Sequence, residues 1–216
     1  MSTMPSLQDH FGDMVGTKQP DFTETRLNLD LLLSTFKVQT KWQVITGASS
    51  SGKTTLIDLF AGQGFQTVPE PGREYIEREL SKGRTIGEIR QDRAAMTRQI
   101  YNLWLEKMSR LPVAQFSFLD RGLPDSLAFY RFAGMDPNGI LPDCFRYRYA
   151  AVFMLDRLPY QQDGIRGGDD ASAAYFESWM ARDYASLGYN LIWVPVLPPE
   201  ERLTFILDRV DESQIA

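Results

Sequence analysis

The residues best suited to chemistry stand together in one octapeptide, residues 47–54, which reads Gly-Ala-Ser-Ser-Ser-Gly-Lys-Thr. It fits the pattern G-x-x-x-x-G-K-[ST], whose glycines allow successive backbone N–H groups to point at one anion. A β-branched run, residues 42–46, precedes the octapeptide, and apolar residues with helical spacing follow it over residues 55–61. The strand, loop and helix expected from this order are the context in which the pattern binds the phosphates of a nucleoside triphosphate.

This glycine-rich loop (residues 47–54) assigns a role to each of its polar side chains. Lys53 is expected to reach the β- and γ-phosphates of ATP, and the Thr54 hydroxyl is expected to ligate Mg²⁺. The residues predicted to bind the nucleotide are Gly47, Ala48, Ser49, Ser50, Ser51, Gly52, Lys53, Thr54 and Thr55. The alternative is an ordinary glycine- and serine-rich turn. All four residues that define the pattern are present between an expected strand and an expected helix, which argues against that alternative.

Further charged residues follow two later strands, predicted over residues 65–68 and 116–119. Ligands of parallel sheets bind at the carboxyl ends of the strands, so these charges should meet the glycine-rich loop at one edge. Asp120 is predicted to hold Mg²⁺ or its water shell beside Thr54, the alternative being a cap of the next helix. Arg121 could contact a substrate hydroxyl or phosphate, or form an ion pair with Asp125 or Asp120.

Glu70 stands between Pro69 and Pro71, which restrict the backbone on both sides of its carboxylate. We predict that Glu70 is the general base that deprotonates an acceptor hydroxyl for in-line attack on the γ-phosphate. The alternative is a solvent-exposed glutamate in a turn. Arg73 is a candidate clamp for a substrate anion, with a surface ion pair to Glu77 as the other interpretation.

The segment of residues 156–170 is polar and glycine-rich and carries two arginines, which is typical of a lid over a phosphate site. Arg166 is the first candidate for an arginine that neutralises charge on the transferring phosphoryl group. Arg157 and Arg182 are the next candidates. An ordinary polar surface loop is the alternative interpretation of this segment.

Strands and helices alternate along the chain, and several strands are continuously apolar, which predicts an α/β fold. We expect a three-layer sandwich of P-loop kinase type around a five-stranded parallel sheet, with strands at residues 42–46, 65–68, 116–119, 151–155 and 191–196. The helices are expected over residues 55–61, 73–80, 86–110, 124–132, 171–187 and 199–210. The domain should occupy residues 41–216, and residues 1–40 should form a partly irregular N-terminal extension. Within it, residues 27–36 fit either alternation or a short helix.

Composition excludes several classes of function. The 216 residues carry a net charge of −5, which argues against a general nucleic-acid-binding surface. The only histidine is His10, and the only cysteine is Cys144, so Ser-His-Asp and Cys-His catalysis, zinc sites built on histidine and an internal disulfide are not expected. No run approaches the roughly 20 apolar residues that span a bilayer, so we expect a cytoplasmic protein. The aromatic residues Phe129, Tyr130, Tyr147 and Tyr149 are expected to pack rather than to stack on a base.

Together, four blocks of sequence resemble the NadR-like AAA/kinase domain family of P-loop proteins: residues 47–55, 68–78, 120–126 and 162–166. The similarity covers about residues 41–210. The family includes ribosylnicotinamide kinase domains, whose lid resembles residues 163–166. Deoxynucleoside kinases are more distantly similar, with Asp120 and Gly122 standing where they have glutamate and serine. Thymidylate-type kinases share a similar Glu-Pro-Gly turn.

We therefore predict ATP- and Mg²⁺-dependent phosphoryl transfer to a hydroxyl of a small, nucleoside-like molecule, in which Lys53, Glu70, Asp120, Arg121 and Arg166 are catalytic. The substrate-binding residues would be Glu70, Arg73 and Arg121, and the metal ligands Thr54 and Asp120. The alternative is a regulatory ATPase- or GTPase-like switch without a small-molecule acceptor, although no Asn-Lys-x-Asp guanine-reading sequence is present. A kinase-like component acting on a macromolecule is a third possibility. The sequence leaves the oligomeric state open, a homodimer included.

Overall fold

The computed structural model describes residues 22–158 and 170–210. Its main sheet has five parallel strands in the order β3-β4-β2-β6-β7. The strands are β2 (Trp42–Thr46), β3 (Thr67–Val68), β4 (Ser117–Asp120), β6 (Ala151–Leu155) and β7 (Leu191–Val194). The predicted α/β fold with a five-stranded parallel sheet is confirmed, although β3, at the edge, is shorter than expected.

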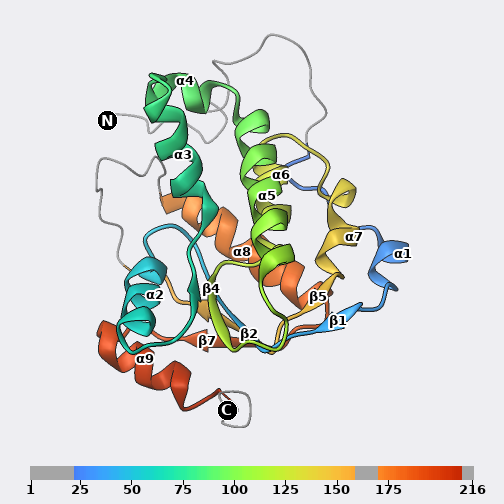
Figure 1. The fold of residues 1–216 in the computed structure, drawn as a ribbon. Helices are drawn as coiled ribbons and strands as arrows, with labels where there is room; N and C mark the ends of the chain where they lie inside the picture. The colour runs from blue at the N-terminus through green and yellow to red at the C-terminus, as the bar shows by residue number, and fades with distance from the viewer. Residues whose placement is uncertain (1–21, 159–169, 211–216) are drawn as a thin grey trace, which may run out of the picture.

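Helices cover both faces of this sheet (Figure 1). On one face, α2 (Lys53–Gly62) and α9 (Pro199–Leu207) pack around Ile45, Phe118 and Phe153. On the other face lie α5 (Arg93–Arg110), α6 (Asp125–Phe132) and α8 (Asp170–Ser186), whose residues pack around Trp42 and Val44. Successive residues of a strand point to opposite faces, so β2 contributes to both cores and the three-layer arrangement follows.

The helix predicted over residues 86–110 is wrong as a single element. The chain forms α4 (Ile86–Gln91) and α5, with Asp92 between them in a non-helical conformation. The Asp92 carboxylate accepts a hydrogen bond from the backbone N–H of Ala95 at 2.8 Å, which is an N-cap. The apolar spacing continues through the break, and therefore periodicity alone could not reveal the two helices.

Helix α3 (Pro71–Ser81) begins earlier than the predicted residue 73. Proline is favoured at the first helical position because its fixed φ suits the helix and its missing N–H would have no partner there. Glu70 is consequently the residue immediately before the helix, in an extended conformation. The carboxylate thus stands at the junction between β3 and α3.

The described part of the N-terminal extension packs on the rest of the chain. It contains α1 (Leu29–Leu32), so the short-helix alternative is correct, and β1 (Val38–Gln39), which pairs in parallel with β5 (Tyr147–Arg148). Arg131 Nε donates to the carbonyl of Thr25 at 2.6 Å, and Tyr175 donates its hydroxyl to the carbonyl of Thr23 at 2.9 Å. Between β5 and α6 the chain forms η1 (Pro137–Gly139) and α7 (Leu141–Cys144).

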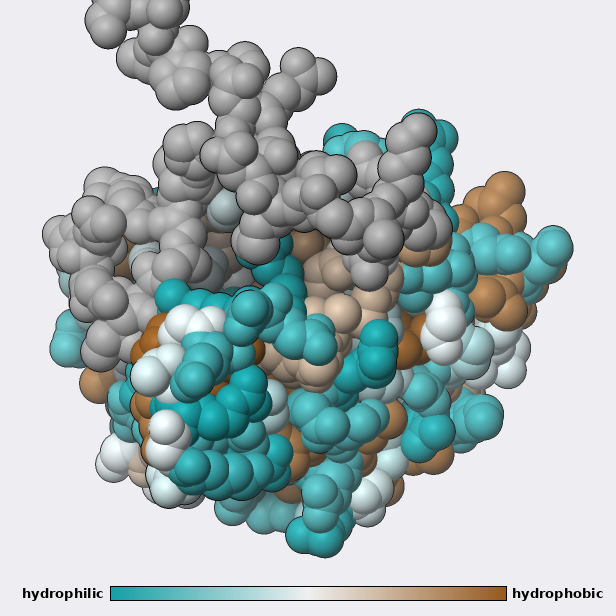
Figure 2. All heavy atoms as spheres, turned by 90° about the horizontal axis from the view of Figure 1, so that it is seen from above, coloured by the Kyte–Doolittle hydropathy of each residue, from teal (hydrophilic) through white to brown (hydrophobic). Residues whose placement is uncertain are grey.

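The surface seen from above is mostly hydrophilic where residues are described, with hydrophobic residues in small groups between them (Figure 2). Among the described helices, none is both long and apolar enough to cross a membrane.

Candidate active site

The glycine-rich loop leaves β2 and turns sharply before α2. Gly47, Ser50 and Gly52 all have positive φ values, of 141°, 60° and 90°. A side chain at residue 47 would also place its Cβ 2.9 Å from the carbonyl oxygen of Leu155, so only glycine fits there. Left-handed residues that alternate with ordinary ones are typical of loops whose N–H groups converge on an anion.

Lys53 occupies the centre of this loop. Its Nζ donates to the carbonyls of Gly47 and Ala48, at 3.0 and 2.6 Å, and lies 3.3 Å from the Ser51 hydroxyl. The residue is only 6% exposed. Burial, together with the positive charge of Arg121, lowers the pKa of the Lys53 ammonium group to about 7.

Arg202 supports the loop from outside and was not found by sequence reasoning. Its guanidinium donates to three carbonyls: Ser51 in the loop at 2.6 Å, Pro195 after β7 at 2.8 Å, and Asp156 after β6 at 3.1 Å. The neighbouring Pro-Glu-Glu sequence is typical of a solvated helix start. The available signal was its position four residues before Ile206, on the buried face of α9.

Asp120 ends β4 beside the loop, because Ile45 and Asp120 are paired across β2 and β4. The Thr54 hydroxyl lies 3.5 Å from Oδ2 of Asp120, and Oδ1 is enclosed without a hydrogen-bond partner. Burial raises the pKa of the Asp120 carboxyl to about 6.

This pair of oxygen ligands fits Mg²⁺, which prefers oxygen and is commonly bound through one or two carboxylates plus phosphate oxygens. Within the described ranges, no group of three or more His, Cys, Asp and Glu residues could form a metal cage. The enclosed, unpartnered Oδ1 of Asp120 is instead consistent with a metal held jointly by the protein and a nucleotide.

Arg121 connects the loop with the opposite side of the site. Its Nη1 donates to the Gly47 carbonyl at 3.0 Å and to Oδ1 of Asp125 at 3.1 Å. Its Nε lies 3.3 Å from Oε2 of Glu70, an ion pair in which Nε makes no hydrogen bond. Of the sequence-based alternatives, the structure shows the ion pair with Asp125, and it adds Glu70 as a second partner.

Asp125 holds this arrangement together at the start of α6. The residue is 1% exposed, yet its carboxylate accepts from the Thr46 hydroxyl, from Arg121, from the N–H of Gly122 at 3.0 Å and from the Tyr184 hydroxyl at 2.6 Å. Arg121 has a φ of 79°, a conformation rare for residues other than glycine. Asp125 therefore bonds both the side chain of Arg121 and the backbone that follows it.

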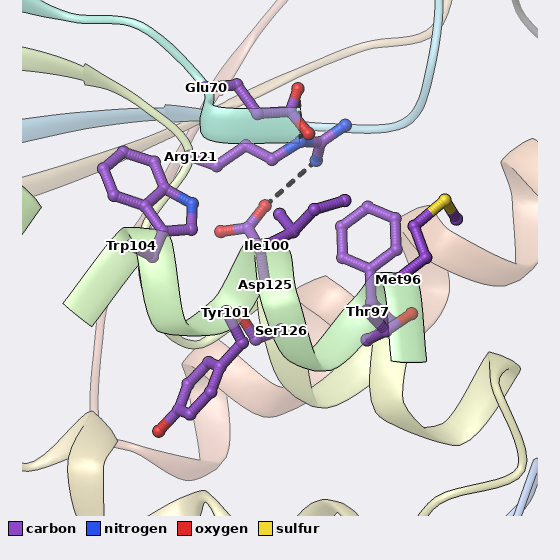
Figure 3. A pocket seen from close by; sticks show the side chains of 10 residues that line it. Glu70, Met96, Thr97, Ile100, Tyr101, Trp104, Arg121, Asp125 and Ser126 are labelled. Atoms are coloured by element: carbon purple, nitrogen blue, oxygen red, sulfur yellow. Dashed lines mark hydrogen bonds and ion pairs between the residues drawn. The ribbon is translucent and has the colours of Figure 1, made fainter. Parts of the chain in front are cut away.

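Glu70 faces a pocket between α3, α5 and α6 (Figure 3). Gly72 leaves room for its carboxylate, since a Cβ at that residue would lie 3.2 Å from Oε1. The pocket, which we call the α5–α6 pocket, is lined by Glu70, Met96, Thr97, Ile100, Tyr101, Trp104, Arg121, Asp125, Ser126 and Phe129. Its empty space, open solvent included, is about 480 Å³.

Residues 42–202 match the model of a family described as an AAA domain. The chain belongs to this family. The matched range contains the glycine-rich loop, Glu70, Asp120 and Arg121, so the AAA domain and the candidate site coincide. The family resemblance stated from the sequence is confirmed at this level, while the ribosylnicotinamide kinase likeness stays a prediction.

Solved structures similar to this AAA domain include two kinases. Deoxyadenosine kinase from M. mycoides, with the products dCMP and a flexible dCDP bound, has a TM-score of 0.53 at 15% identity, over 78% of this chain and 97% of that chain. Thymidylate kinase from Candida albicans has a TM-score of 0.52 at 13% identity, over 82% of this chain and 93% of that one. These identities establish a shared fold. No protein of curated function matches the sequence.

The AAA domain brings the central predicted residues to one sheet edge: Lys53, Thr54, Glu70, Asp120 and Arg121. Their predicted roles stay predictions, because geometry alone does not show a ligand contact.

The other candidates lie elsewhere. Arg73 is exposed at the start of α3, outside the residues lining the pocket, and among the described ion pairs it has none with Glu77. Arg166 lies outside the described residues. Arg157 pairs with Glu177 at 3.1 Å, and Arg182 lies 5.3 Å from the centre of the Trp179 ring.

Sequence reasoning also missed part of the pocket wall. Phe129 does not only pack, since it lines the α5–α6 pocket with the Arg121 guanidinium 5.2 Å from its ring centre. The wall residues Thr97, Tyr101 and Trp104 belong to the same buried set of α5 as the core residue Met108. Their spacing therefore signals burial and does not distinguish a pocket wall from a core.

Proposed function

We propose that this AAA domain is a kinase that transfers the γ-phosphoryl group of ATP to a hydroxyl of a small, nucleoside-like molecule. One observation carries the proposal. Glu70 lines the α5–α6 pocket and pairs with Arg121, whose Nη1 bonds the Gly47 carbonyl of the glycine-rich loop. A base at the junction between a pocket and a phosphate-binding loop is what transfer to a bound acceptor requires.

The proposed step uses the residues in distinct ways. The acceptor hydroxyl oxygen forms a bond to the γ-phosphorus while its proton passes to a carboxylate oxygen of Glu70. The bond from the γ-phosphorus to the β,γ-bridging oxygen breaks, and its electron pair remains on that oxygen, giving ADP. Glu70 is 32% exposed, so the proton can then leave to solvent.

Charge stabilisation falls to the groups around the loop. Lys53 and the loop N–H groups would bind the triphosphate, and Arg121 would offset negative charge that develops between loop and pocket. Thr54 and Asp120 would hold Mg²⁺, which neutralises charge on phosphate oxygens when it is bound. Arg166 keeps its proposed role as the lid arginine on sequence grounds alone.

The nucleoside-like acceptor is supported from two directions. The similar solved structures include a deoxyadenosine kinase and a thymidylate kinase. The pocket is also lined by three aromatic residues, Tyr101, Trp104 and Phe129, whose side chains are suited to a planar ring. A regulatory switch has no use for such a pocket beside the loop, which is why we favour the kinase.

An acceptor screen tests the proposal. The protein is incubated with Mg²⁺ and ATP labelled at the γ-phosphate, with nucleosides, nucleoside monophosphates and other small alcohols as acceptors. We expect ADP release above the acceptor-free rate and label in the acceptor, both lost in Lys53→Ala. ADP release that no small acceptor stimulates, and that changes only when a protein partner is added, would support the switch instead.

A further inference from the structure

We infer that the hydroxyls of Thr97 and Ser126 determine acceptor specificity by binding the polar edge of an uncharged, planar ring. This inference rests on the proposed function, because it takes the α5–α6 pocket as the acceptor site. It adds two specificity-determining residues to the proposed kinase. It also predicts that nucleosides bind more tightly than their monophosphates as acceptors.

The first observation is that both hydroxyls are buried and unpartnered. Thr97 on α5 is 8% exposed and Ser126 on α6 is 6% exposed, and both line the pocket. Among the described interactions, neither side chain makes a hydrogen bond. Other helical hydroxyls of this chain do, as in Thr204 to the Glu200 carbonyl at 3.0 Å and Ser109 to the Glu106 carbonyl at 2.8 Å.

The second observation places these hydroxyls in open space. In the described residues, the fully enclosed polar side-chain atoms without a partner are only Asp120 Oδ1 and Arg121 Nε. The oxygens of Thr97 and Ser126 also lack partners, so they are not fully enclosed, and both residues line the pocket. A hydroxyl that lines a pocket without a protein partner is free to bond a ligand atom that faces it.

The third observation is the charge of the wall. Among the described residues, its charged members are one arginine, Arg121, and two carboxylates, Glu70 and Asp125, so their formal sum is −1. Arg121 already pairs with both carboxylates. Among the described wall residues, a phosphate monoester on the acceptor would meet no cation without a carboxylate partner, so its desolvation would be costly.

Different residues of the pocket wall thus have different tasks. Glu70 and Arg121 face the glycine-rich loop, where the hydroxyl to be phosphorylated must lie. Thr97 and Ser126 project from α5 and α6, the helices that form the remaining wall (Figure 3). A hydroxyl can donate or accept a hydrogen bond, so the ring needs at least one polar atom of either kind on its edge.

Direct binding tests this inference without requiring turnover. The full chain, with Mg²⁺ and a non-hydrolysable ATP analogue, is titrated calorimetrically with adenosine, deoxyadenosine, thymidine and their 5′-monophosphates. We expect at least one nucleoside to bind and its monophosphate to bind at least about tenfold more weakly. Thr97→Val and Ser126→Ala should each weaken nucleoside binding about three- to tenfold, with affinity for the ATP analogue unchanged.

Matched variants separate recognition from folding. Thr204→Val and Ser109→Ala make the same chemical changes outside the pocket and should bind like the wild type. Thr97→Ser keeps the hydroxyl and should restore binding even if Thr97→Val proves too unstable to measure. Monophosphates that bind as tightly as nucleosides, no nucleoside binding, or hydroxyl-free variants that bind like the wild type would each overturn the inference.

The outcomes also distinguish this inference from the proposed function. Nucleoside binding that depends on Thr97 and Ser126, without phosphoryl transfer, would support the recognition and contradict the kinase. Phosphoryl transfer with an unchanged KM for the acceptor in Thr97→Val and Ser126→Ala would contradict the recognition and leave the kinase standing.

Discussion

Glu70 Oε2 and Arg121 Nε lie 3.3 Å apart, on two elements that are fifty residues apart in sequence. Glu70 stands between β3 and α3, and Arg121 directly follows β4, so the ion pair connects these two parts of the chain. Nη1 of Arg121 also donates to the Gly47 carbonyl at 3.0 Å. The candidate base is therefore held at a set position relative to the glycine-rich loop. If Glu70 is the base, a change in the conformation of Arg121 should therefore also displace Glu70 and slow phosphoryl transfer.

Replacing Asp125 should disturb that conformation. Asp125→Asn removes the charge that pairs with buried Arg121, and loss of one partner of a buried ion pair costs about 3 kcal/mol or more. Tyr184→Phe removes one neutral donor to the same carboxylate, so its cost should be about 1 kcal/mol. Urea denaturation measures both. Equal and small losses would show that Asp125 does not hold Arg121.

Replacing Asp120 should remove the effect of Mg²⁺ on nucleotide binding. In the wild type, Mg²⁺ should strengthen ATP-analogue binding, whereas in Asp120→Asn the ratio of dissociation constants with and without Mg²⁺ should fall at least about tenfold. Asp58→Asn, at an exposed position of α2, is the matched control. Titration of a fluorescent ATP analogue gives the four constants. An undiminished Mg²⁺ effect in Asp120→Asn would exclude Asp120 as a metal ligand.

Nucleotide affinity should depend on pH in both directions. Burial lowers the pKa of Lys53 to about 7, so above pH 7 the free protein holds a neutral lysine that must take up a proton to bind phosphate. Burial raises the pKa of Asp120 to about 6, so below pH 6 a proton competes with Mg²⁺. Affinity for the Mg²⁺–ATP analogue should peak between pH 6 and 7.

Titrations from pH 5 to 9 check this profile. Above pH 7 the dissociation constant should rise by up to about tenfold per pH unit, as expected for uptake of one proton. Lys53→Met should lose the alkaline limb and keep the acidic one. A wild-type affinity that is flat from pH 6 to 9 would contradict the assignment to Lys53.

Arg202 should matter for the loop although it is remote from the α5–α6 pocket. Arg202→Met removes hydrogen bonds to three carbonyls and should weaken ATP-analogue binding about tenfold or more, together with a loss of stability. Arg209→Met is the control, since Arg209 is exposed and its guanidinium donates to the nearby Phe205 carbonyl at 2.9 Å. Unchanged affinity in Arg202→Met would mean that the loop keeps its shape without this support.

The sheet and the convergence of charges could be predicted because they depend on local patterns. Apolar strands, the glycine-rich loop and charged residues at the strand ends place Lys53, Glu70 and Asp120 at one edge of any parallel sheet. The break at Asp92 could not be predicted from the spacing of apolar residues, because that spacing continues across the break. What marks the start of the second helix is the N-cap at Asp92.

Partners distant in sequence were the other limit. Arg202 donates a hydrogen bond to the carbonyl of Ser51, 151 residues away in sequence, and Asp125 accepts one from Tyr184, 59 residues away. Thr97 and Ser126 became candidates only when the structure showed their hydroxyls buried, unpartnered and open to one pocket. Such sites depend on tertiary packing, which a single sequence does not reveal.

The central claim is that Glu70 acts as the base in phosphoryl transfer, and one comparison of rates tests it most directly. Single-turnover transfer of labelled γ-phosphate from ATP to the best acceptor of the screen is measured for the wild type, Glu70→Gln and Glu74→Gln. Glu74 is an exposed glutamate on α3, the helix that follows Glu70. We predict that Glu70→Gln is slower by about 10²–10⁴ with unchanged affinity for the ATP analogue, and that Glu74→Gln is unaffected. Transfer by Glu70→Gln at the wild-type rate would contradict the account.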